Sequence, residues 1–256
     1  MKIRTVARDT VLEAVRGRWL WMAALGALAV AAIAGFARGL ALAEEHELAI
    51  AFAAPIARLV AVLIVVLTAI TSLVREQSDR TQLLALAAPM SRSAWLLGKL
   101  AGLASIAALT GVVLALPLAL FGPDPVAALV WTGSLVLELV LMASVCLAIG
   151  VVLTQIPPAV CAAIAFYVLA RDLHVVQLLA TRADSYSEFG AAGPVVQAVA
   201  AVFPRLDLFT RTDWLLASGG AASIAHDFGA VVLQAAIYGL LAFSVAVLDL
   251  RRAQLG

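Results

Sequence analysis

Residues 75–102 read REQSDRTQLLALAAPMSRSAWLLGKLAG, a polar and amphipathic stretch between two long apolar runs. Its charged start is followed by apolar residues at helical spacing, which form one stripe: Leu83, Leu84, Leu86 and Ala87. Pro89 ends this helix, and the Ser-Arg-Ser turn at 91–93 can cap the next one. The pattern predicts a short helix at a membrane surface, placed between two spanning helices and open to a soluble partner.

The composition around this stretch is that of a membrane protein. Of the 256 residues, 64% are hydrophobic and 13% are charged, with a mean hydropathy of +1.06. Soluble domains are about half apolar and about a quarter charged. The net charge of +1 gives no indication of a nucleic-acid partner.

Six segments approach or exceed the roughly 20 apolar residues that cross a bilayer as a helix. They are residues 20–42, 50–74, 94–121, 126–153, 159–180 and 226–247. The sequence therefore predicts an all-α, polytopic fold with six transmembrane helices, in a single domain over residues 1–256.

Two further segments are predicted to lie at the membrane surface. Residues 1–19 are basic and amphipathic, as in interfacial helices. With the Ala-Leu-Ala at 41–43 they also resemble a signal peptide, but the long, acid-containing leader disfavours that reading. Residues 181–225 contain an apolar piece too short to span (194–203) and an amphipathic piece (204–216), which we interpret as re-entrant or interfacial helices on the extracytoplasmic side.

The basic residues predict the orientation. On one side lie Lys2, Arg4, Arg8, Arg16, Arg18, Arg75, Arg80, Arg92, Lys99, Arg251 and Arg252. In the membrane or beyond it lie Arg38, Arg58, Arg171, Arg182, Arg205 and Arg211. Because basic residues collect in cytoplasmic loops, both termini and residues 75–93 are expected in the cytoplasm.

Glu138 lies near mid-depth of the fourth predicted span. An ionisable group there costs about 3 kcal/mol, so we expect it to pair with Arg171 or, less favoured, with Arg58. A structural pair or a neutral carboxyl is favoured over a place on the substrate route. Arg171, Asp172 and His174 either mark the outer mouth of a pathway or, as we favour, lie at the headgroups beyond a short fifth span.

Two weaker patterns concern packing and metal binding. The Gly-x-x-x-Gly pairs at 35–39 and 98–102 permit close helix contact but are common in a Gly- and Ala-rich chain. Met142 and Cys146 share a helix face, with Cys161 within reach, which could suit a soft metal. Ordinary packing is favoured, and no metal or cofactor site is predicted.

The residues from Glu76 to Lys99 resemble the first cytoplasmic loop of type-2 ABC transporter permeases. That loop has an acidic residue, a Gly-Thr-Leu-Glu-like helix, Leu-Pro-hydrophobe-Ser-Arg, and a Gly-Lys pair. Here Asp-Arg-Thr-Gln at 79–82 replaces the usual glycine and glutamate. The stretch FPRLDLFTRTDWLL at 203–216 is similar to the branch linked to maturation of multi-copper enzymes, such as nitrous-oxide reductase.

The resemblance implies that two permease subunits pair, with a homodimer favoured over a heterodimer, and that each sits on an ABC ATP-binding subunit. An extracytoplasmic accessory protein and the lipid bilayer are further expected partners. The coupling helix at 75–90 would contact the ATPase through Arg75, Glu76, Asp79, Arg80, Leu83, Leu84, Leu86 and Met90. The bland alternative is a solvated loop in which Glu76 and Arg80, four residues apart, brace each other by about 0.2–0.5 kcal/mol.

The ATPase itself is expected in a separate chain that binds ATP and Mg. Gly98-Lys99 is the only Gly-Lys pair, and its neighbours do not form a phosphate-binding loop. No H-E-x-x-H or G-x-S-x-G motif indicates an enzyme. We therefore expect an ATP-driven permease, with export favoured and cofactor maturation as one use. The alternatives are a gradient-driven transporter using Glu138 and a non-transporting assembly or sensor subunit.

Overall fold

The computed structural model describes residues 3–40, 45–78, 91–121, 124–183, 202–216 and 221–252. Within these ranges the regular structure is helical. The elements are α1 (Ile3–Arg16), α2 (Trp19–Leu40), α3 (Glu45–Ser78), α5 (Arg92–Phe121), α6 (Pro125–Val152), α7 (Ile156–Ala183), η1 (Leu206–Leu208), α9 (Asp213–Leu216) and α10 (Ala221–Arg252). Five of them are long and apolar enough to cross a membrane, namely α2, α3, α5, α6 and α10. The all-helical fold expected from the sequence is confirmed for the described residues, and five helices of this length and composition are consistent with a multi-pass membrane protein.

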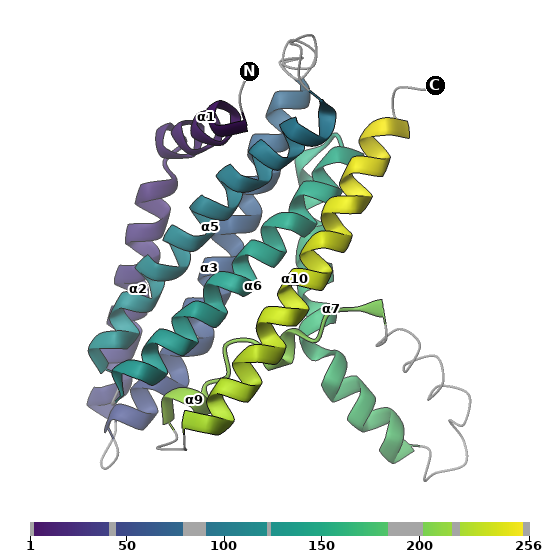
Figure 1. Cartoon of the computed structure of the whole chain (residues 1–256). Helices are drawn as coiled ribbons and strands as arrows, with labels where there is room; N and C mark the ends of the chain where they lie inside the picture. The colour runs from purple at the N-terminus through teal and green to yellow at the C-terminus, as the bar shows by residue number, and fades with distance from the viewer. Residues whose placement is uncertain are drawn as a thin grey trace.

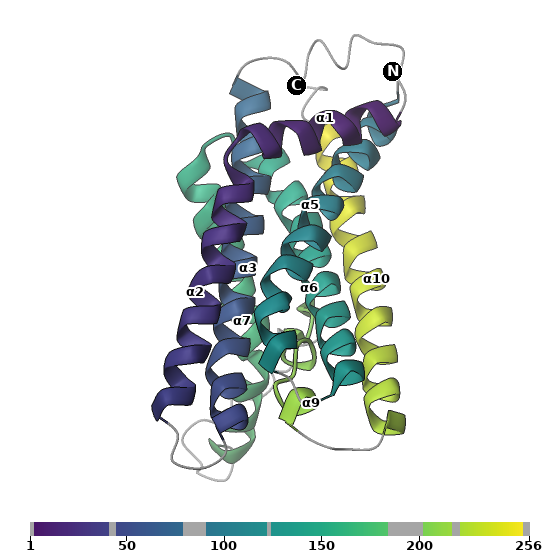
Figure 2. The ribbon, with the colours of Figure 1, turned by 90° about the vertical axis from the view of Figure 1, so that its left-hand side faces the viewer.

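The long helices lie side by side in one bundle (Figure 1). In it α6 packs against α3, α5, α7 and α10, and many of its residues are fully buried. Figure 2 shows α1 lying across one end of the bundle. We call this the α1 end. The last described turns of α3 and α10 and the start of α5 also lie there, whereas α9 lies at the opposite end.

Local signals set the boundaries of α6 and α7. Asp124 caps α6, because its Oδ1 accepts a hydrogen bond from the Val126 amide at 2.9 Å. Pro125 follows at the first helical position, where its missing N–H costs nothing. After Val152 the backbone becomes extended, and α7 begins after three connecting residues, with two prolines in its first turn. The connection between α6 and α7 is therefore short and lies at the α1 end.

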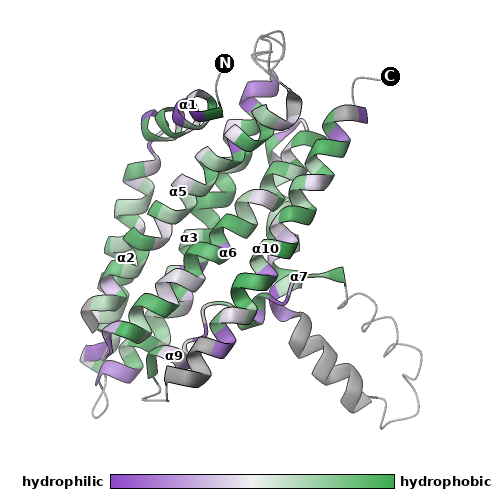
Figure 3. Ribbon diagram, viewed as in Figure 1, coloured by the Kyte–Doolittle hydropathy of each residue, from purple (hydrophilic) through white to green (hydrophobic). Residues whose placement is uncertain are grey.

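Apolar side chains cover the outside of the bundle as well as its core. On α2, Trp21 and Phe36 are 71% and 70% exposed, and on α6 Leu129 is 72% exposed. Figure 3 shows hydrophobic residues along the middle of the bundle and hydrophilic ones gathered toward its two ends. An exposed apolar surface of this extent indicates contact with lipid.

The predicted spans match the helices closely, with three differences. The segment predicted as the fifth span forms α7, which carries Arg171 and Asp172 and is not among the five helices above. Residues 75–78, predicted as the start of a separate coupling helix, continue α3 instead. The remaining coupling residues lie outside the described ranges: Asp79, Arg80, Leu83, Leu84, Leu86 and Met90.

The third difference concerns residues 204–216, predicted as an amphipathic helix. They form the 3-10 turn η1 and the one-turn helix α9. Between them Thr210 has a φ of 48°, which interrupts the helical backbone, and its amide bonds to Ser134 Oγ at 3.0 Å. The apolar residues Phe209 and Trp214 are buried in the core. Of the rest of the segment, residues 184–201 and 217–220 lie outside the described ranges.

The glycine pair at 98–102 brings α1 onto α5. A Cβ added at Gly98 would lie 2.7 Å from Val6 Cβ, and one added at Gly102 would lie 2.6 Å from Thr10 Cβ and 2.9 Å from the Ala7 carbonyl. Real Cβ atoms do not approach that closely, so only glycine allows this contact. A Cβ added at Gly35 or Gly39 of α2 would have no atom within 4 Å.

We expect the Gly102→Ala variant to be less stable than the native chain by about 1–2 kcal/mol, because overpacking outweighs the better helix propensity of alanine. The Gly35→Ala variant should be unchanged or up to about 1 kcal/mol more stable. Equilibrium unfolding in mild detergent, followed by circular dichroism, measures both. Equal stability of the two variants would contradict the close α1–α5 contact.

Candidate functional site

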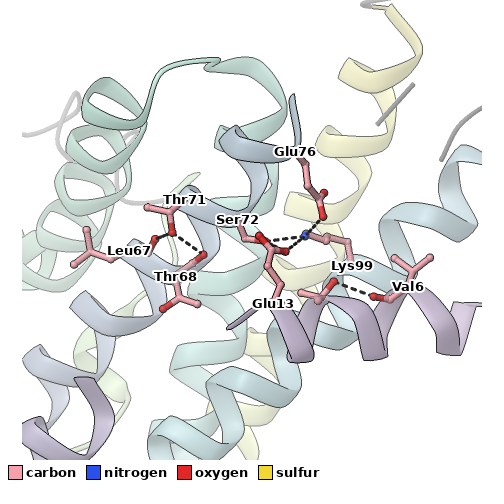
Figure 4. Close-up of polar contacts among 9 residues, drawn as sticks. Val6, Glu13, Leu67, Thr68, Thr71, Ser72, Glu76 and Lys99 are labelled. Carbon is pink, nitrogen blue, oxygen red and sulfur yellow. Dashed lines mark hydrogen bonds and ion pairs between the residues drawn. The ribbon is translucent and has the colours of Figure 1, made fainter. Parts of the chain in front are cut away.

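A fully buried lysine ties three helices together at the α1 end (Figure 4). Lys99 of α5 is 0% exposed. Its Nζ donates to Glu76 Oε1 at 2.5 Å and to Ser72 Oγ at 2.8 Å, both on α3. Glu13 Oε2, on α1, lies 3.5 Å from the same nitrogen and accepts a hydrogen bond from Ser72 at 2.8 Å. We call these four residues the Lys99 cluster.

The cluster compensates the cost of burying a charge. An ammonium removed from water is tolerated only when it is paired and hydrogen-bonded, and here two carboxylates and one hydroxyl surround it. The Glu13 side chain is 40% exposed, whereas the Glu76 side chain is 26% exposed and its Oε2 is buried. Lys99 and Glu76 are therefore the desolvated members of the cluster, and Glu13 connects them to the edge of the bundle.

The sequence indicated only part of this cluster. Sequence patterns indicated Lys99 only as part of the family-like Gly-Lys pair and as a cytoplasmic basic residue, not as a site residue, and Glu76 was expected to contact Arg80 or a partner protein. In the structure Glu76 bonds to Lys99 instead, while Arg80 lies outside the described ranges. A lone lysine within an apolar helix always needs an anion. The four-residue spacing of Ser72 and Glu76 could have indicated α3 as the helix that supplies the anion, but nothing in the sequence pattern indicated Glu13.

Replacing Lys99 with methionine should lower the free energy of unfolding by about 2–3 kcal/mol, below the range for a fully buried pair because the Glu13 side chain is partly exposed. Adding Glu76→Gln should recover part of that loss, since it removes one uncompensated charge. As the matched control, Arg8→Met removes an exposed cation of α1 and should change stability by less than about 0.5 kcal/mol. A Lys99→Met variant as stable as the control would contradict the role given to the cluster.

A second polar cluster surrounds Glu138, which is 0% exposed in the middle of α6. The ion pair expected with Arg171 is present, with 3.6 Å between Glu138 Oε1 and Arg171 Nη1. Tyr167 donates to the same oxygen at 3.1 Å, and Thr210 Oγ1 donates to Oε2 at 2.8 Å. Both carboxylate oxygens therefore have hydrogen-bond donors from other elements.

Arg171 also fastens the segment around η1 to the bundle. Its Nη1 donates to the carbonyls of Leu206 and of Phe209, the latter at 3.1 Å. Thr210 completes the connection through its bonds to Glu138 and Ser134. An otherwise irregular segment is thus held inside the bundle by charge-assisted hydrogen bonds.

The other intramembrane charges expected near Glu138 lie differently. Arg58, on α3, comes close enough to Tyr167 and Arg171 to interact electrostatically with both, and its buried Nε has no hydrogen-bond partner in the described part of the chain. Among the described residues Glu138 pairs with Arg171 and not with Arg58. Asp172 is exposed on α7 and takes no part in the cluster. The side chain of His174 lies outside the described residues.

No group of three histidine, cysteine, aspartate or glutamate side chains in the described ranges could hold a metal ion. Cys146 is buried in α6 and Cys161 is exposed on α7. Burial of Met142 and Cys146 in the apolar core agrees with their interpretation as packing residues.

We expect Glu138→Gln to destabilise the protein by about 2–4 kcal/mol, because Arg171 then keeps its hydrogen bonds but loses its counter-charge. Asp172→Asn changes the same functional group at an exposed site and should shift stability by less than about 0.5 kcal/mol. Unfolding in detergent distinguishes the two. If Glu138→Gln is as stable as the native chain, the pair has no structural role.

Comparison with known proteins adds no relative. No protein-family model matches this chain, and no curated protein matches it. The functional conclusion therefore rests on the residues and their geometry.

Proposed function

We propose that this chain is the permease subunit of an ATP-driven ABC transporter, with export as its direction. Two copies pair as a homodimer in a bacterial inner membrane, with both termini in the cytoplasm, and each sits on a separate ATP-binding subunit. That subunit binds ATP and Mg and performs the hydrolysis, so the permease needs no catalytic residue or cofactor of its own. Maturation of a metalloenzyme is one process such an exporter could serve.

The observation that carries the proposal is the Lys99 cluster. Glu76 lies in the last turns of α3 and Lys99 about two turns into α5, so the ion pair joins the two helices that flank residues 79–90. Glu13 adds α1 to the same contact. A force applied to residues 79–90 would therefore reach three helices through one buried set of charges. If residues 79–90 were only a solvated connecting loop, an ion pair that joins its two flanking helices would not be required.

The arrangement of the helices supports the proposed topology. The flanks of residues 79–90, α1 and the last turns of α10 lie at one end of the bundle, where the basic residues are expected in the cytoplasm (Figure 1). Six crossings require α7 to span as well. In favour of that, α7 begins at the α1 end, whereas α9, which follows it in the chain, lies at the opposite end (Figure 2).

The geometry around Glu138 favours the ATP-driven mechanism over a gradient-driven one. A carboxyl that carries protons or ions must exchange its partners during the cycle. Glu138 instead has donors on both oxygens and anchors the segment around η1 through Arg171 and Thr210. We therefore assign Glu138 to the scaffold of the permease.

The proposal predicts that the tagged protein, extracted gently from its native membrane, retains an ATP-binding subunit in a 1:1 ratio. Combining Leu83→Asp with Leu84→Asp should abolish retention, because two charges would enter the apolar stripe of the coupling helix. Mass spectrometry of the purified complex measures the ratio, and proteins that accompany it would indicate the cargo.

The matched control places the same two charges in the same segment but off the stripe, as Thr81→Asp with Gln82→Asp. It should retain the ATPase to within about twofold, because the stripe stays apolar. Equal loss in both double variants would mean that the stripe is not the contact. Recovery of the native protein without any ATPase would overturn the proposed function.

A further inference from the structure

A cavity of about 300 Å³ lies at the elbow between α1 and α2, against α3. Its walls come from three helices, with Ala14 and Gly17 on one side, Trp19 and Met22 on another, and α3 behind. The elbow is a tight one: the Gly17 amide closes the last turn of α1 by bonding the Glu13 carbonyl at 2.8 Å, and Arg18 takes a left-handed φ of 69°. The cavity is thus at the α1 end, where the membrane helices meet the transverse helix.

The α3 wall of this cavity is graded from polar to apolar. Arg75, Ser72, Thr71 and Thr68 follow each other along one side of α3, with Leu67 beside them. From Arg75 to Thr68 the helix descends by about 10 Å toward the middle of the bundle. Arg75 is exposed at the rim, and it makes no hydrogen bond or ion pair with a described residue. The opposite wall, from Trp19 and Met22, is largely apolar.

Thr68 is the unusual residue of this wall. It is 8% exposed, and its Oγ1 is buried without a hydrogen-bond partner among the described residues. Four other helical threonines bond back to the carbonyl four residues earlier: Thr10, Thr71, Thr110 and Thr132. Figure 4 shows Thr71 and Thr68 on neighbouring turns of α3, with the Thr71 hydroxyl bonded to the Leu67 and Thr68 carbonyls. A buried hydroxyl that forgoes this bond costs about 1–3 kcal/mol unless another group accepts it.

The charged residues that line the cavity indicate whether a bound group should be an anion or a cation. Glu13 also lines the cavity, but its charge is offset by the hydrogen bond from Ser72 and by Lys99 at 3.5 Å. Arg75 is left as the cation that faces the cavity without a counter-ion in the described ranges. The cavity therefore fits a molecule with three parts: an anion at Arg75, an acceptor oxygen near Thr68 and an apolar part against Met22 and Leu67.

We propose that the cavity is a binding site for a membrane glycerophospholipid. The lipid phosphate pairs with Arg75, an ester carbonyl of the glycerol accepts the Thr68 hydroxyl, and an acyl chain runs along Met22 and Leu67. In a phospholipid the esters lie just below the phosphate on the side of the hydrocarbon, which is the order of these groups along α3. A free phosphate would satisfy Arg75 but would leave the apolar wall and the deeper hydroxyl without a contact.

The bound lipid has a consequence for the fold. It fills the gap between α1, α2 and α3 beside the Lys99 cluster, and it touches Arg75 three residues before the end of α3. On the side that faces the bilayer, the lipid therefore holds α1 against the spanning helices. The Lys99 cluster does the same on the side of the protein core. This site depends on the membrane location of the chain and not on an ATPase partner.

The test is a lipid titration of the full, delipidated chain by native mass spectrometry, with palmitoyl-oleoyl phosphatidylethanolamine as the probe. The native protein should bind one lipid more tightly than the rest. Thr68→Val, which keeps the shape and removes the hydroxyl, should weaken that binding about fivefold, the worth of one hydrogen bond. Arg75→Gln, at an exposed position that folding tolerates, should weaken it tenfold or more, because a charged partner is lost.

The matched control is Thr132→Val. Thr132 lines a separate cavity of about 400 Å³ between α5 and α6, and its hydroxyl already bonds the Ala128 carbonyl at 2.7 Å. This variant should bind the tight lipid as the native protein does.

Three outcomes would overturn the proposal. Thr68→Val could bind the lipid as tightly as the native chain, which would mean that water satisfies the hydroxyl. Thr132→Val could weaken binding as much as Thr68→Val, which would place the lipid elsewhere. Inorganic phosphate at millimolar concentration could displace the lipid completely, which would make the site one for a free anion.

Discussion

The buried ammonium of Lys99 is the constraint on which the arrangement of the α1 end depends. In a bundle whose outside and inside are both apolar, burial of hydrophobic surface gives helices little reason to choose one neighbour over another. A desolvated cation does specify which helices pack together, because only anions within reach can compensate its charge. Glu76 and Ser72 bring α3 to α5, and Glu13 brings α1 to the same point. The transverse position of α1 follows from this contact together with the glycine pair below it.

Glu138 performs the same task in the interior of the bundle. Its carboxylate gathers Tyr167 and Arg171 from α7 and Thr210 from the segment after it. Arg171 in turn donates to the carbonyls of Leu206, in the short turn η1, and of Phe209, just after it. Non-helical backbone inside a membrane protein needs such partners, since lipid offers none. Two polar clusters thus fix the two parts of the fold that are not simple spans.

The two clusters suggest how the proposed transport function would work. If an ATP-binding subunit acts on residues 79–90, the Lys99 cluster would couple α1, α3 and α5 to that motion. The Glu138 cluster holds α6, α7 and the segment around η1 as one unit. Conformational change in such a bundle is expected between these units and not within them, because packed and hydrogen-bonded groups move as rigid bodies. A phospholipid at the elbow of α1 and α2 would keep the first unit seated in the membrane.

The sequence by itself determined that the fold consists of long apolar helices, where these helices lie along the chain, and that Glu138 needs a partner. Length and hydropathy decide these properties locally, and a mid-span carboxyl has few cations from which to choose. Only the tertiary structure decided that Lys99 contacts Glu13 and Glu76. It also decided that, among the described residues, Gly98 and Gly102 form a close helix contact while Gly35 and Gly39 do not, and that the Thr68 hydroxyl has no hydrogen-bond partner there. These features depend on which helix faces bury each other, and apolar faces of nearly equal hydropathy carry no signal for that choice.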